Sequence, residues 1–402
     1  MKAQTQNQAG STGQPGQRKR TGLARGFAML AAFALLVPAQ AQEKPKKPAA
    51  QVTQVTEKKD RIEISEEHAA AVKRGLDWLA KNQNKDGSWT ADVGFKLNHN
   101  YRATAKGKGH VGVTALAGMA YLAGGHFPGR GPYGKNVEGC LDFVISCARE
   151  DGYITYASTR MYSHAFATLF LAEIYGMTHR EDVRAHLQKA VDFIVKSQNM
   201  EGGWRYVPLD RGSDMSIVVC QVLALRAARN IGIRVPKATI DRAIDYVVAS
   251  AVTGKTQKDK HGRRYSGDLG TFHYQKEDLA RTTFPLTAAG VTALHGLGVY
   301  SSELIDHGVD FLQSRMDHFN SLYGSRGHYY FWYGHYYGVQ AMYTVGGHAW
   351  LTYFRSLRKY LLEHQLADGS WPNRDGPGPA FSTAVACLIL EIPYGYLPIF
   401  QR

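Results

Sequence analysis

The sequence predicts an all-α fold, an (α/α)6 toroid in which six helical hairpins form two concentric rings. Two observations predict it: an aromatic–Gln–Trp pattern recurs with constant spacing, and amphipathic helices alternate with helices that are apolar on most sides. The composition fits a folded globular chain, since 44% of the 402 residues are hydrophobic and 20% are charged. The repeats continue from about residue 65 to the C-terminus. They therefore indicate one large domain.

The first 41 residues have the order of a secretory signal peptide. Basic residues precede an apolar run at 27–37, and Ala39-Gln40-Ala41 supplies a cleavage site with small residues at both ends. The apolar run is too short to span a bilayer as a stable helix. We therefore expect residues 1–41 to be cleaved on export, with the mature protein in the periplasm or secreted.

A tether is predicted between this signal and the toroid. Residues 42–64 are rich in Lys, Pro and Gln and poor in large apolar side chains, which is typical of a flexible segment. Residues 65–402 are then the single toroid domain.

The formal charge of the chain is +14. The signal region holds five basic residues and no acidic ones, so the mature chain keeps about +9, much of it in the tether and in residues 255–264. A basic surface of this kind favours anionic partners such as lipid headgroups or acidic polysaccharide. The alternative is a solvated charged face. No nucleic-acid-binding motif accompanies the charge, so nucleic acid is not expected as a partner, and the oligomeric state is not indicated.

The four cysteines are expected to be buried free thiols. Cys140, Cys147, Cys220 and Cys387 all lie in apolar helical runs. Cys140 and Cys147 are seven residues apart in one predicted helix, a rise of roughly 10 Å. A disulfide requires Cα atoms closer than about 7 Å.

The repeat is the strongest signal in the sequence. Three segments align without a gap: Trp78-x4-Gln83-x5-Trp89, Phe193-x4-Gln198-x5-Trp204 and Tyr360-x4-Gln365-x5-Trp371. A glycine stands two residues before each final Trp. A fourth segment, at 143–154, keeps the helix and Asp151-Gly152 but has lost the Gln and the Trp, and two more, starting at Tyr246 and Phe311, keep only the helix.

Each part of the repeat has a structural reason. The first helix of a hairpin ends near the Gln, and the glycine supplies the left-handed residue that closes a helix C-terminus. We expect the Gln amide to donate to free carbonyls there and to accept from the N–H groups of the next helix. The Trp is expected to pack over this polar contact.

A second, more uniformly apolar helix follows each of these six. A helix that is apolar on most sides is a buried one, so these helices are predicted to form the inner ring. They are expected near Val111–Ala123, His164–Tyr175, Ser216–Ala228, Leu286–Leu297, Tyr336–Val345 and Ser382–Leu390. An open solenoid is the alternative, but it would not leave its second helices apolar throughout.

The aromatic–Gln–Trp pattern resembles the QW repeat of the terpenoid cyclase and protein prenyltransferase toroids, which include squalene–hopene cyclases and the β subunits of protein prenyltransferases. The resemblance covers the chain after residue 65 and bears on fold more than on chemistry. It implies a cavity at the centre of the inner ring, with functional residues near the N-termini of inner helices. On this sequence it implies Asp214 and His335 as catalytic candidates. The implied ligand-binding candidates near the inner-helix starts are His110, Tyr162, His164, Ser216 and Ser382.

Asp214 lies where squalene–hopene cyclases carry their DxDD acid motif. In the segment 212–216 it falls on the central acid of that motif, while Met215 and Gly212 replace the last and the first Asp. Protonation of an alkene requires a positioned acid with neighbouring carboxyl groups. The acid cluster is therefore incomplete. The alternative role of Asp214 is to cap the helix that follows, as Asp commonly does.

Residues 329–337 are the densest aromatic run of the chain, and they add Tyr330, Trp332, Tyr333 and Tyr336 to the ligand-binding candidates. Aromatic faces can line a cavity for a long apolar ligand and stabilise a carbocation. The same rings can instead fill the interior of a plugged barrel.

A metal or another cofactor is not expected. The run at 329–337 resembles the repeat that supplies zinc ligands in protein farnesyltransferase β subunits, but Tyr333, His335 and Ser382 fall at the three ligand positions, which leaves one ligand. The alternative is a zinc site of His110, His164, Asp214 and His335 at the centre of the ring, but no local ligand spacing supports it. Phosphate-binding, nucleophile-elbow and Asp-rich Mg²⁺ motifs are also absent from the sequence.

Three functions compete. The first is an enzyme, cyclase-like or transferase-like, that acts on a long isoprenoid-like molecule in a central aromatic cavity; whether the chain is an enzyme stays open, because the acid cluster and the zinc triad are incomplete. The second is a toroid that only binds a ligand or serves as a scaffold. The third is a polysaccharide lyase or glycosidase, which would need a carboxylate pair or a positioned base.

The insertion at 253–281 is expected to be a rim loop, a lid or a tolerated excursion.

Overall fold

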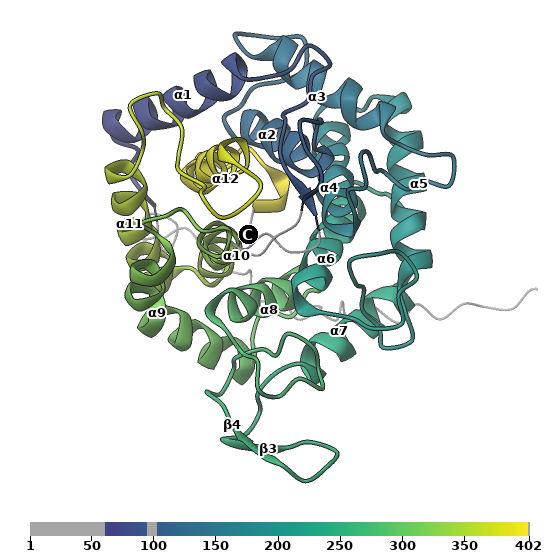
Figure 1. Ribbon diagram of the computed structural model, residues 1–402, viewed down its shortest axis with the longest axis vertical. Helices are drawn as coiled ribbons and strands as arrows, with labels where there is room; N and C mark the ends of the chain where they lie inside the picture. The colour runs from purple at the N-terminus through teal and green to yellow at the C-terminus, as the bar shows by residue number, and fades with distance from the viewer. Residues whose placement is uncertain (1–60, 95–102, 401–402) are drawn as a thin grey trace, which may run out of the picture. The chain divides into compact units, whose positions relative to one another are not determined.

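Helices alternate between an outer and an inner ring along the chain (Figure 1). The computed structural model describes residues 61–94 and 103–400, and these contain twelve α-helices. The outer helices are α1 (Glu66–Lys81), α3 (Gly134–Ser146), α5 (Glu181–Ser197), α7 (Lys237–Ala249), α9 (Glu303–Tyr323) and α11 (Gly347–Glu363). The inner helices are α2 (Val111–Ala123), α4 (Met161–Thr178), α6 (Met215–Asn230), α8 (Phe284–Gly296), α10 (Tyr329–Val345) and α12 (Pro379–Glu391). The expected signal peptide and the tether up to residue 60 lie outside the described residues.

The inner ring is closed. Each inner helix packs against the next one, and α12 packs against α2, so the last inner helix meets the first. The outer ring closes as well, through contacts of α11 with α1. The all-α toroid predicted from the repeats is therefore confirmed, and the open solenoid is excluded.

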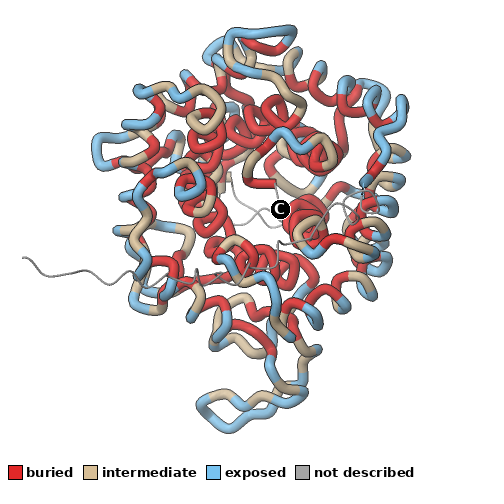
Figure 2. The backbone as a smooth tube through the Cα atoms, turned by 180° about the vertical axis from the view of Figure 1, so that it is seen from behind, coloured by how far each residue is buried: buried red, intermediate tan, exposed pale blue. Residues whose placement is uncertain are grey.

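Burial explains why the two kinds of helix differ in sequence. Every residue of α2 is buried, because this helix is covered by α3 on one side and by neighbouring inner helices on the others. The outer helix α5 instead buries one stripe and leaves the opposite face exposed (Figure 2). An inner helix therefore tolerates apolar residues all round, whereas an outer helix must be amphipathic.

The aromatic–Gln–Trp repeat joins three of the outer helices, α1, α5 and α11, to the next one. Gln198 donates from Nε2 to the carbonyl of Gly202 at 2.8 Å and to the carbonyl of Thr239 in α7 at 2.9 Å. Gln83 and Gln365 make the equivalent pairs of bonds, to Gly87 and Asn136 and to Gly369 and Ala71. Because Ala71 belongs to α1, the last repeat fastens the end of the chain to its beginning.

The tryptophan of each repeat caps the outer helix. The indole Nε1 of Trp204 donates to the carbonyl of Ile194 at 2.8 Å, in the last turn of α5. Trp89 and Trp371 donate in the same way to Leu79 and Leu361. The repeat itself thus supplies a hydrogen bond to a carbonyl in the last turn of each of these three helices, where intrahelical donors run out.

One detail of the predicted repeat was wrong. The Gln oxygen does not accept from the N–H groups of the next helix but from side chains: Arg242 Nη2 donates to Gln198 Oε1 at 2.5 Å, and Asn136 Nδ2 donates to Gln83 Oε1 at 2.7 Å. The reason is that the Gln meets the side of the next helix, where carbonyls and side chains are accessible, rather than the end where its free N–H groups point.

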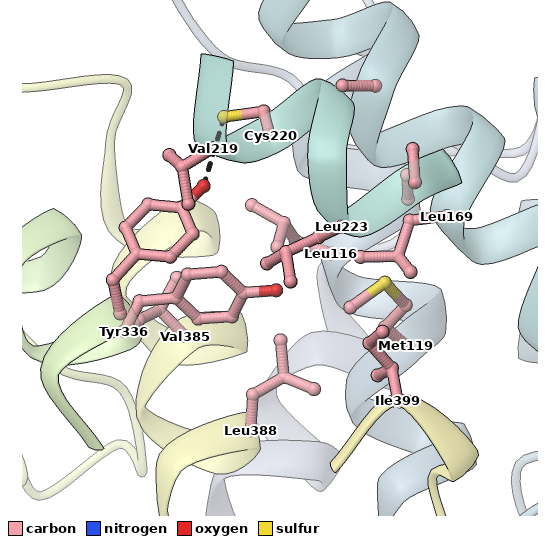
Figure 3. Packing of buried hydrophobic residues seen from close by; sticks show 14 of the residues in the cluster. Leu116, Met119, Leu169, Val219, Cys220, Leu223, Tyr336, Val385, Leu388 and Ile399 are labelled. Atoms are coloured by element: carbon pink, nitrogen blue, oxygen red, sulfur yellow. Dashed lines mark hydrogen bonds between the residues drawn. The ribbon is translucent and has the colours of Figure 1, made fainter. Parts of the chain in front are cut away.

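The C-terminal segment closes one end of the inner ring. After α12 the chain forms two short 3-10 helices, η1 (Ile392–Tyr394) and η2 (Pro398–Phe400), and η2 packs against α4, α6 and α10. Figure 3 shows Ile399 beside Met119, Leu169 and Leu388, all buried. The centre of the ring at this level is therefore filled with apolar side chains instead of an open cavity.

Two short hairpins complete the described elements. The strands β1 (Val93–Gly94) and β2 (Ala103–Ala105) pair before α2, and β3 (Thr256–Lys258) pairs with β4 (Arg264–Ser266) in the insertion between α7 and α8. No helix in the described part of the chain is long and apolar enough to cross a membrane. The four cysteines are free and buried, as predicted.

Candidate functional site

The inner helices run in the same direction, so their N-termini gather at one end of the ring. The starts of α4, α6 and α10 meet, because Tyr162 and Tyr333 both donate to Ser216. The ends of α6, α8 and α10 meet at the opposite end, around the C-terminal segment. At the end with the N-termini, four of the residues selected from the sequence are joined by hydrogen bonds: Tyr162, Asp214, Ser216 and Tyr333.

Asp214 is the buried acid at this end. Its side chain caps α6, since Oδ1 accepts from the N–H of Ile217 at 3.1 Å and from Ser216 Oγ at 2.5 Å. The other oxygen, Oδ2, is buried without a hydrogen-bond partner. Burial raises the pKa of Asp214 to about 6, although the Ser216 hydroxyl acts in the opposite direction. Capping is therefore confirmed, but it uses only one of the two carboxyl oxygens.

Hydroxyl groups extend from this acid into the ring. The Tyr162 hydroxyl donates to Ser216 Oγ at 2.6 Å, and Ser216 in turn donates to Asp214. Tyr333, from the first turns of α10, donates to the backbone carbonyl of Ser216 at 3.1 Å. Three inner helices thus place one carboxyl, one serine and two tyrosines in contact.

Two further tyrosines come from loops. Tyr206 and Tyr274 share a hydrogen bond of 2.6 Å between their hydroxyls, and the Tyr206 ring lies 5.9 Å from that of Tyr162. We call Tyr162, Tyr206, Asp214, Ser216, Tyr274 and Tyr333 the Asp214 cluster. Its four tyrosines are half-buried, whereas Asp214 itself is fully buried.

Sequence reasoning missed Tyr206 and Tyr274. The sequence pointed to the starts of inner helices and to the aromatic run at 329–337, whereas Tyr206 lies two residues after the tryptophan of a repeat and Tyr274 lies within the insertion. Their pairing depends on the contact between two loops that are far apart in sequence. One feature of the sequence could have indicated these two tyrosines: each lies in the loop that precedes an inner helix.

The structure places His335 and His164 away from the Asp214 cluster. His335 contacts Tyr353 Oη at 2.9 Å and Asn320 Oδ1 at 2.7 Å, which are side chains of the outer helices α11 and α9. His164 accepts from the N–H of Ile154 at 3.1 Å and lies 3.2 Å from the carbonyl of Ala190 in α5.

Both histidines therefore face the outer ring and have both ring nitrogens occupied. Burial lowers the pKa of His335 to about 3 and that of His164 to about 4, so both are neutral at ordinary pH. The structure does not bring His335 and Asp214 together, and each histidine fills a structural position between the rings.

The remaining candidates are scattered. His110 caps α2 by accepting from the N–H of Val113, and Ser382 donates to the carbonyl of Trp371 at 2.7 Å. Trp332 is buried and donates to the carbonyls of Gly327 and Pro372. The structure thus gives these three positions to local backbone contacts.

The aromatic run divides between two environments. It forms the first turns of α10, which begins at Tyr329, seven residues earlier than expected. Tyr330 stays half-buried and packs against Tyr323 and Tyr329. Tyr336 is buried nearer the centre of the ring. The centroid of its aromatic ring lies 6.0 Å from that of the half-buried Phe166. The run therefore contributes both to the end of the ring and to its packed centre.

A small cavity lies at the other end of the ring. Its volume is about 20 Å³, roughly the space of one water molecule, and it opens between the ends of α6, α8 and α10 and the C-terminal segment. Arg226, His295 and Gln340 are among its lining residues. This cavity is too small for a long apolar ligand and contains none of the predicted site residues.

Within the described residues, no group of three His, Cys, Asp or Glu side chains lies close enough to hold a metal ion. What the Asp214 cluster offers is a single carboxyl with a pKa raised to about 6, which keeps its proton in mildly acidic surroundings, together with aromatic faces. Such an arrangement can bind an apolar or cationic group, and it can supply one proton.

The closed double ring of alternating outer and inner helices defines an α/α toroid. The chain belongs to the prenyltransferase alpha-alpha toroid domain family, whose model matches residues 57–369. Among curated proteins, none matches the sequence significantly.

Solved structures with the same fold carry several chemistries. A type II terpene cyclase from Scytonema in complex with geranylgeranyl dihydroxybenzoate has a TM-score of 0.51 at 14% identity, covering 82% of this chain and 98% of that one. An α-amylase from Clostridium perfringens has a TM-score of 0.55 at 9% identity, covering 81% and 98%. A cellobiose 2-epimerase from Bacillus thermoamylovorans has a TM-score of 0.51 at 10% identity, covering 80% and 98%. Likenesses at this identity show the fold alone.

Proposed function

We propose that this chain is an exported toroid that binds a long apolar, isoprenoid-like molecule against the Asp214 cluster, at the end of the ring where the inner helices begin. The observation that carries the proposal is the convergence of four half-buried tyrosines on one fully buried carboxyl. Aromatic side chains that remain partly exposed beside a packed core provide a surface for an apolar ligand.

The end of the ring with the C-terminal segment is unsuited to such a ligand. Leu397, Ile399 and Phe400 are buried there and fill the centre together with side chains from the inner helices. A ligand must therefore approach from the end that carries the Asp214 cluster. This restricts the proposed site to one face of the toroid.

A chemical step, if the protein performs one, would use Asp214 as the proton donor. With its pKa raised to about 6 by burial, the carboxyl holds a proton in mildly acidic surroundings, and the chain of hydroxyls through Ser216 and Tyr162 leads toward the half-buried rings. A raised pKa keeps the proton on the carboxyl but makes it a weaker acid, and the Asp214 cluster contains no second carboxyl to assist it. We therefore propose binding as the primary function and proton transfer as secondary.

A scaffold without a ligand is the second candidate. The observation in its favour is the packed centre of the ring, where Leu116, Met119 and Leu223 are buried (Figure 3). A scaffold predicts that the cluster tyrosines stabilise the fold and bind nothing.

Glycoside cleavage is disfavoured. It requires two carboxyl groups on either side of the scissile bond, roughly 5 to 10 Å apart. Among the residues that make up the Asp214 cluster, Asp214 supplies the one carboxyl. The likeness to an α-amylase fold does not supply the missing group.

A binding experiment separates these candidates. The purified mature chain is titrated with squalene and with prenols of increasing length in detergent, and complexes are counted by native mass spectrometry. We expect Tyr162→Ala and Tyr333→Ala to weaken binding by about tenfold, because each removes an aromatic contact face. Tyr300→Ala, an exposed tyrosine beyond the other end of the ring, is the matched control. Absence of any complex, or equal losses in all three variants, would favour the scaffold.

Export is tested separately. The proposal expects the protein recovered from the envelope or medium of the producing cell to begin at Gln42, as found by N-terminal sequencing. A chain that retains residues 1–41 inside the cell would contradict this part of the proposal.

A further inference from the structure

The insertion between α7 and α8 carries a basic hairpin, which we define as residues 255–266. Figure 1 shows its strands β3 and β4 extending beyond the outer ring, and Figure 2 shows the same segment almost entirely exposed. The strands pair antiparallel, with Thr256 opposite Ser266, Gln257 opposite Tyr265 and Lys258 opposite Arg264. From the sequence this insertion is expected to be a rim loop, a lid or a tolerated excursion, and its charge is expected to favour an anionic partner.

The base of the hairpin is fixed to the ring. The residues before and after it continue the antiparallel pairing, since the N–H of Val252 donates to the carbonyl of Thr271 and the N–H of His273 donates to the carbonyl of Ser250, both at 2.8 Å. His273 Nε2 also lies 2.8 Å from Gln257 Oε1, which joins the base to the first strand. The hairpin is therefore held in a defined direction rather than attached by an unstructured linker.

The tip of the hairpin is built around its one carboxylate. Asp259 Oδ1 accepts from the N–H groups of His261 and Arg263, each at 2.9 Å, and Oδ2 accepts from Arg263 Nε at 2.6 Å. These bonds lower the pKa of Asp259, so it is ionised at neutral pH. The negative charge of Asp259 is thus occupied by the turn and by one arginine.

The other cations of the hairpin have little compensation. Residues 255–266 contain five Lys and Arg residues and one acidic residue. Lys260 lies 3.9 Å from Glu277, but both side chains are more than 70% exposed, where an ion pair contributes little. In the part of the chain that the structure describes, Lys255, Lys258 and Arg264 form no ion pair.

Two of these cations face each other directly. Lys258 and Arg264 are cross-strand partners, and both are exposed on the same face of the hairpin. Opposed side chains have Cβ atoms about 5 Å apart, and like charges at this distance destabilise a hairpin. An anion bound between them would remove this repulsion and accept hydrogen bonds from both groups.

We propose that the basic hairpin is a docking element for an acidic polysaccharide, a polymer that carries carboxylate or sulfate groups. A bilayer surface fits less well, because the hairpin has no exposed large apolar side chain to enter the lipid and its single aromatic residue, Tyr265, is half-buried. Single-stranded nucleic acid fits less well for the same reason, since no exposed ring is available to stack on bases. The preference for a glycan over duplex DNA rests on the proposed export.

The test measures binding of the purified mature chain to immobilised polygalacturonate and dextran sulfate, with uncharged dextran, vesicles containing phosphatidylglycerol, and duplex DNA as the other surfaces. The hairpin variant is Lys258→Gln with Arg264→Gln. The matched control is Lys85→Gln with Lys135→Gln, which changes the net charge equally. Both lysines are exposed, one shortly after α1 and one in α3, and Figure 1 shows these two helices on the opposite side of the ring from the hairpin. Circular dichroism shows whether each variant keeps the helical fold.

We expect both acidic polysaccharides to bind at about 0.05 M salt and to be released at about 0.5 M, because screening weakens exposed charge pairs. The hairpin variant should lose about tenfold or more in affinity, and the control variant should lose less than about twofold. Three results would overturn the proposal: no binding to either polysaccharide, equal losses in both variants, or affinity for vesicles or DNA that equals or exceeds affinity for the glycans. None of these results depends on the Asp214 cluster, so failure here leaves the proposed apolar ligand untouched.

Discussion

At the scale of single residues, Asp214 combines two roles that the sequence presented as alternatives. One oxygen caps α6 while the other is buried and has no hydrogen-bond partner. The pKa of a carboxylic acid in this position is raised, because burial destabilises the charged form more than the capping hydrogen bonds stabilise it. Substitutions can separate the cap from the acid.

We predict that Asp214→Asn is more stable than Asp214→Ala by about 1 kcal/mol. Asparagine keeps an oxygen that can accept from the N–H of Ile217, whereas alanine leaves that donor without its partner. Urea unfolding of the two purified variants, followed by circular dichroism, measures the difference. Equal midpoints for the two variants would show that the cap contributes nothing.

The stability of the wild-type protein relative to Asp214→Asn should depend on pH. The pKa of Asp214 is raised from 3.8 to about 6 in the folded state, so the folded protein binds this proton more tightly than the unfolded chain does. The contribution is fully present below pH 4 and is lost as the pH rises to about 6, with an upper limit of about 3 kcal/mol.

Unfolding of both proteins in urea at several pH values measures this effect. Buried histidines with lowered pKa values also change stability with pH, but they are common to both proteins and cancel in the difference. A difference in unfolding free energy that stays constant between pH 4 and 7 would contradict the assignment of a raised pKa.

At the scale of the elements, the glycine of each repeat is as important as the Gln and the Trp. Gly202 has a φ of +88°, and a Cβ atom there would lie 2.2 Å from the carbonyl oxygen of Arg242 in the next outer helix. Gly87 and Gly369 have the same φ range and the same close approach, to Gly139 and Arg74. The glycine therefore allows neighbouring hairpins to touch backbone to backbone.

We predict that Gly202→Ala destabilises the protein by about 2 kcal/mol more than Gly298→Ala. Gly298 has a similar φ of +91° but open space around it, so its substitution costs only the left-handed backbone conformation, about 1 kcal/mol. Gly202→Ala adds a steric conflict with a backbone carbonyl that cannot move without shifting α7. Thermal and urea unfolding of both variants provide the comparison, and equal losses would mean that the close approach is unimportant.

The sequence predicted the alternation of outer and inner helices well, because each repeat is visible in a short stretch of sequence. The inner helix α2 was predicted at its observed bounds, and the alternation of apolar and amphipathic helices followed directly from burial. The start of α10 was missed by seven residues, because its aromatic side chains were assigned to a site and not to helical turns.

The missed features depend on contacts between distant segments. Nothing local marks Tyr206 and Tyr274 as partners, since 67 residues separate them and the contact exists only when the ring closes. The same holds for the position of His335, whose neighbours come from two outer helices. Residue types and sequence positions alone therefore predicted more residues in one site than the structure brings together.

At the scale of the whole molecule, ring closure and the C-terminal segment decide which end can be functional. The segment after α12 packs across the ends of three inner helices, while the other end of the ring carries the Asp214 cluster. The toroid is thus asymmetric, with one end sealed by apolar packing.

We predict that Leu397→Ala destabilises the protein by about 2 to 4 kcal/mol, because this leucine is 1% exposed within the sealed end. Leu366→Ala, at a leucine that is 47% exposed in the last repeat, is the control and should change stability by less than about 0.5 kcal/mol. Urea unfolding compares the two. Similar small effects would mean that the C-terminal segment is not part of the cooperative core.

The most direct measurement of the proposed function is photo-crosslinking with a long prenol that carries a diazirine, followed by mapping of the labelled peptides by mass spectrometry. We predict labels within residues 160–166 and 329–333, at the end of the ring with the Asp214 cluster, and their suppression by excess unlabelled prenol. Labels confined to the outer helices or to the C-terminal segment, or labelling that excess prenol does not reduce, would contradict this prediction.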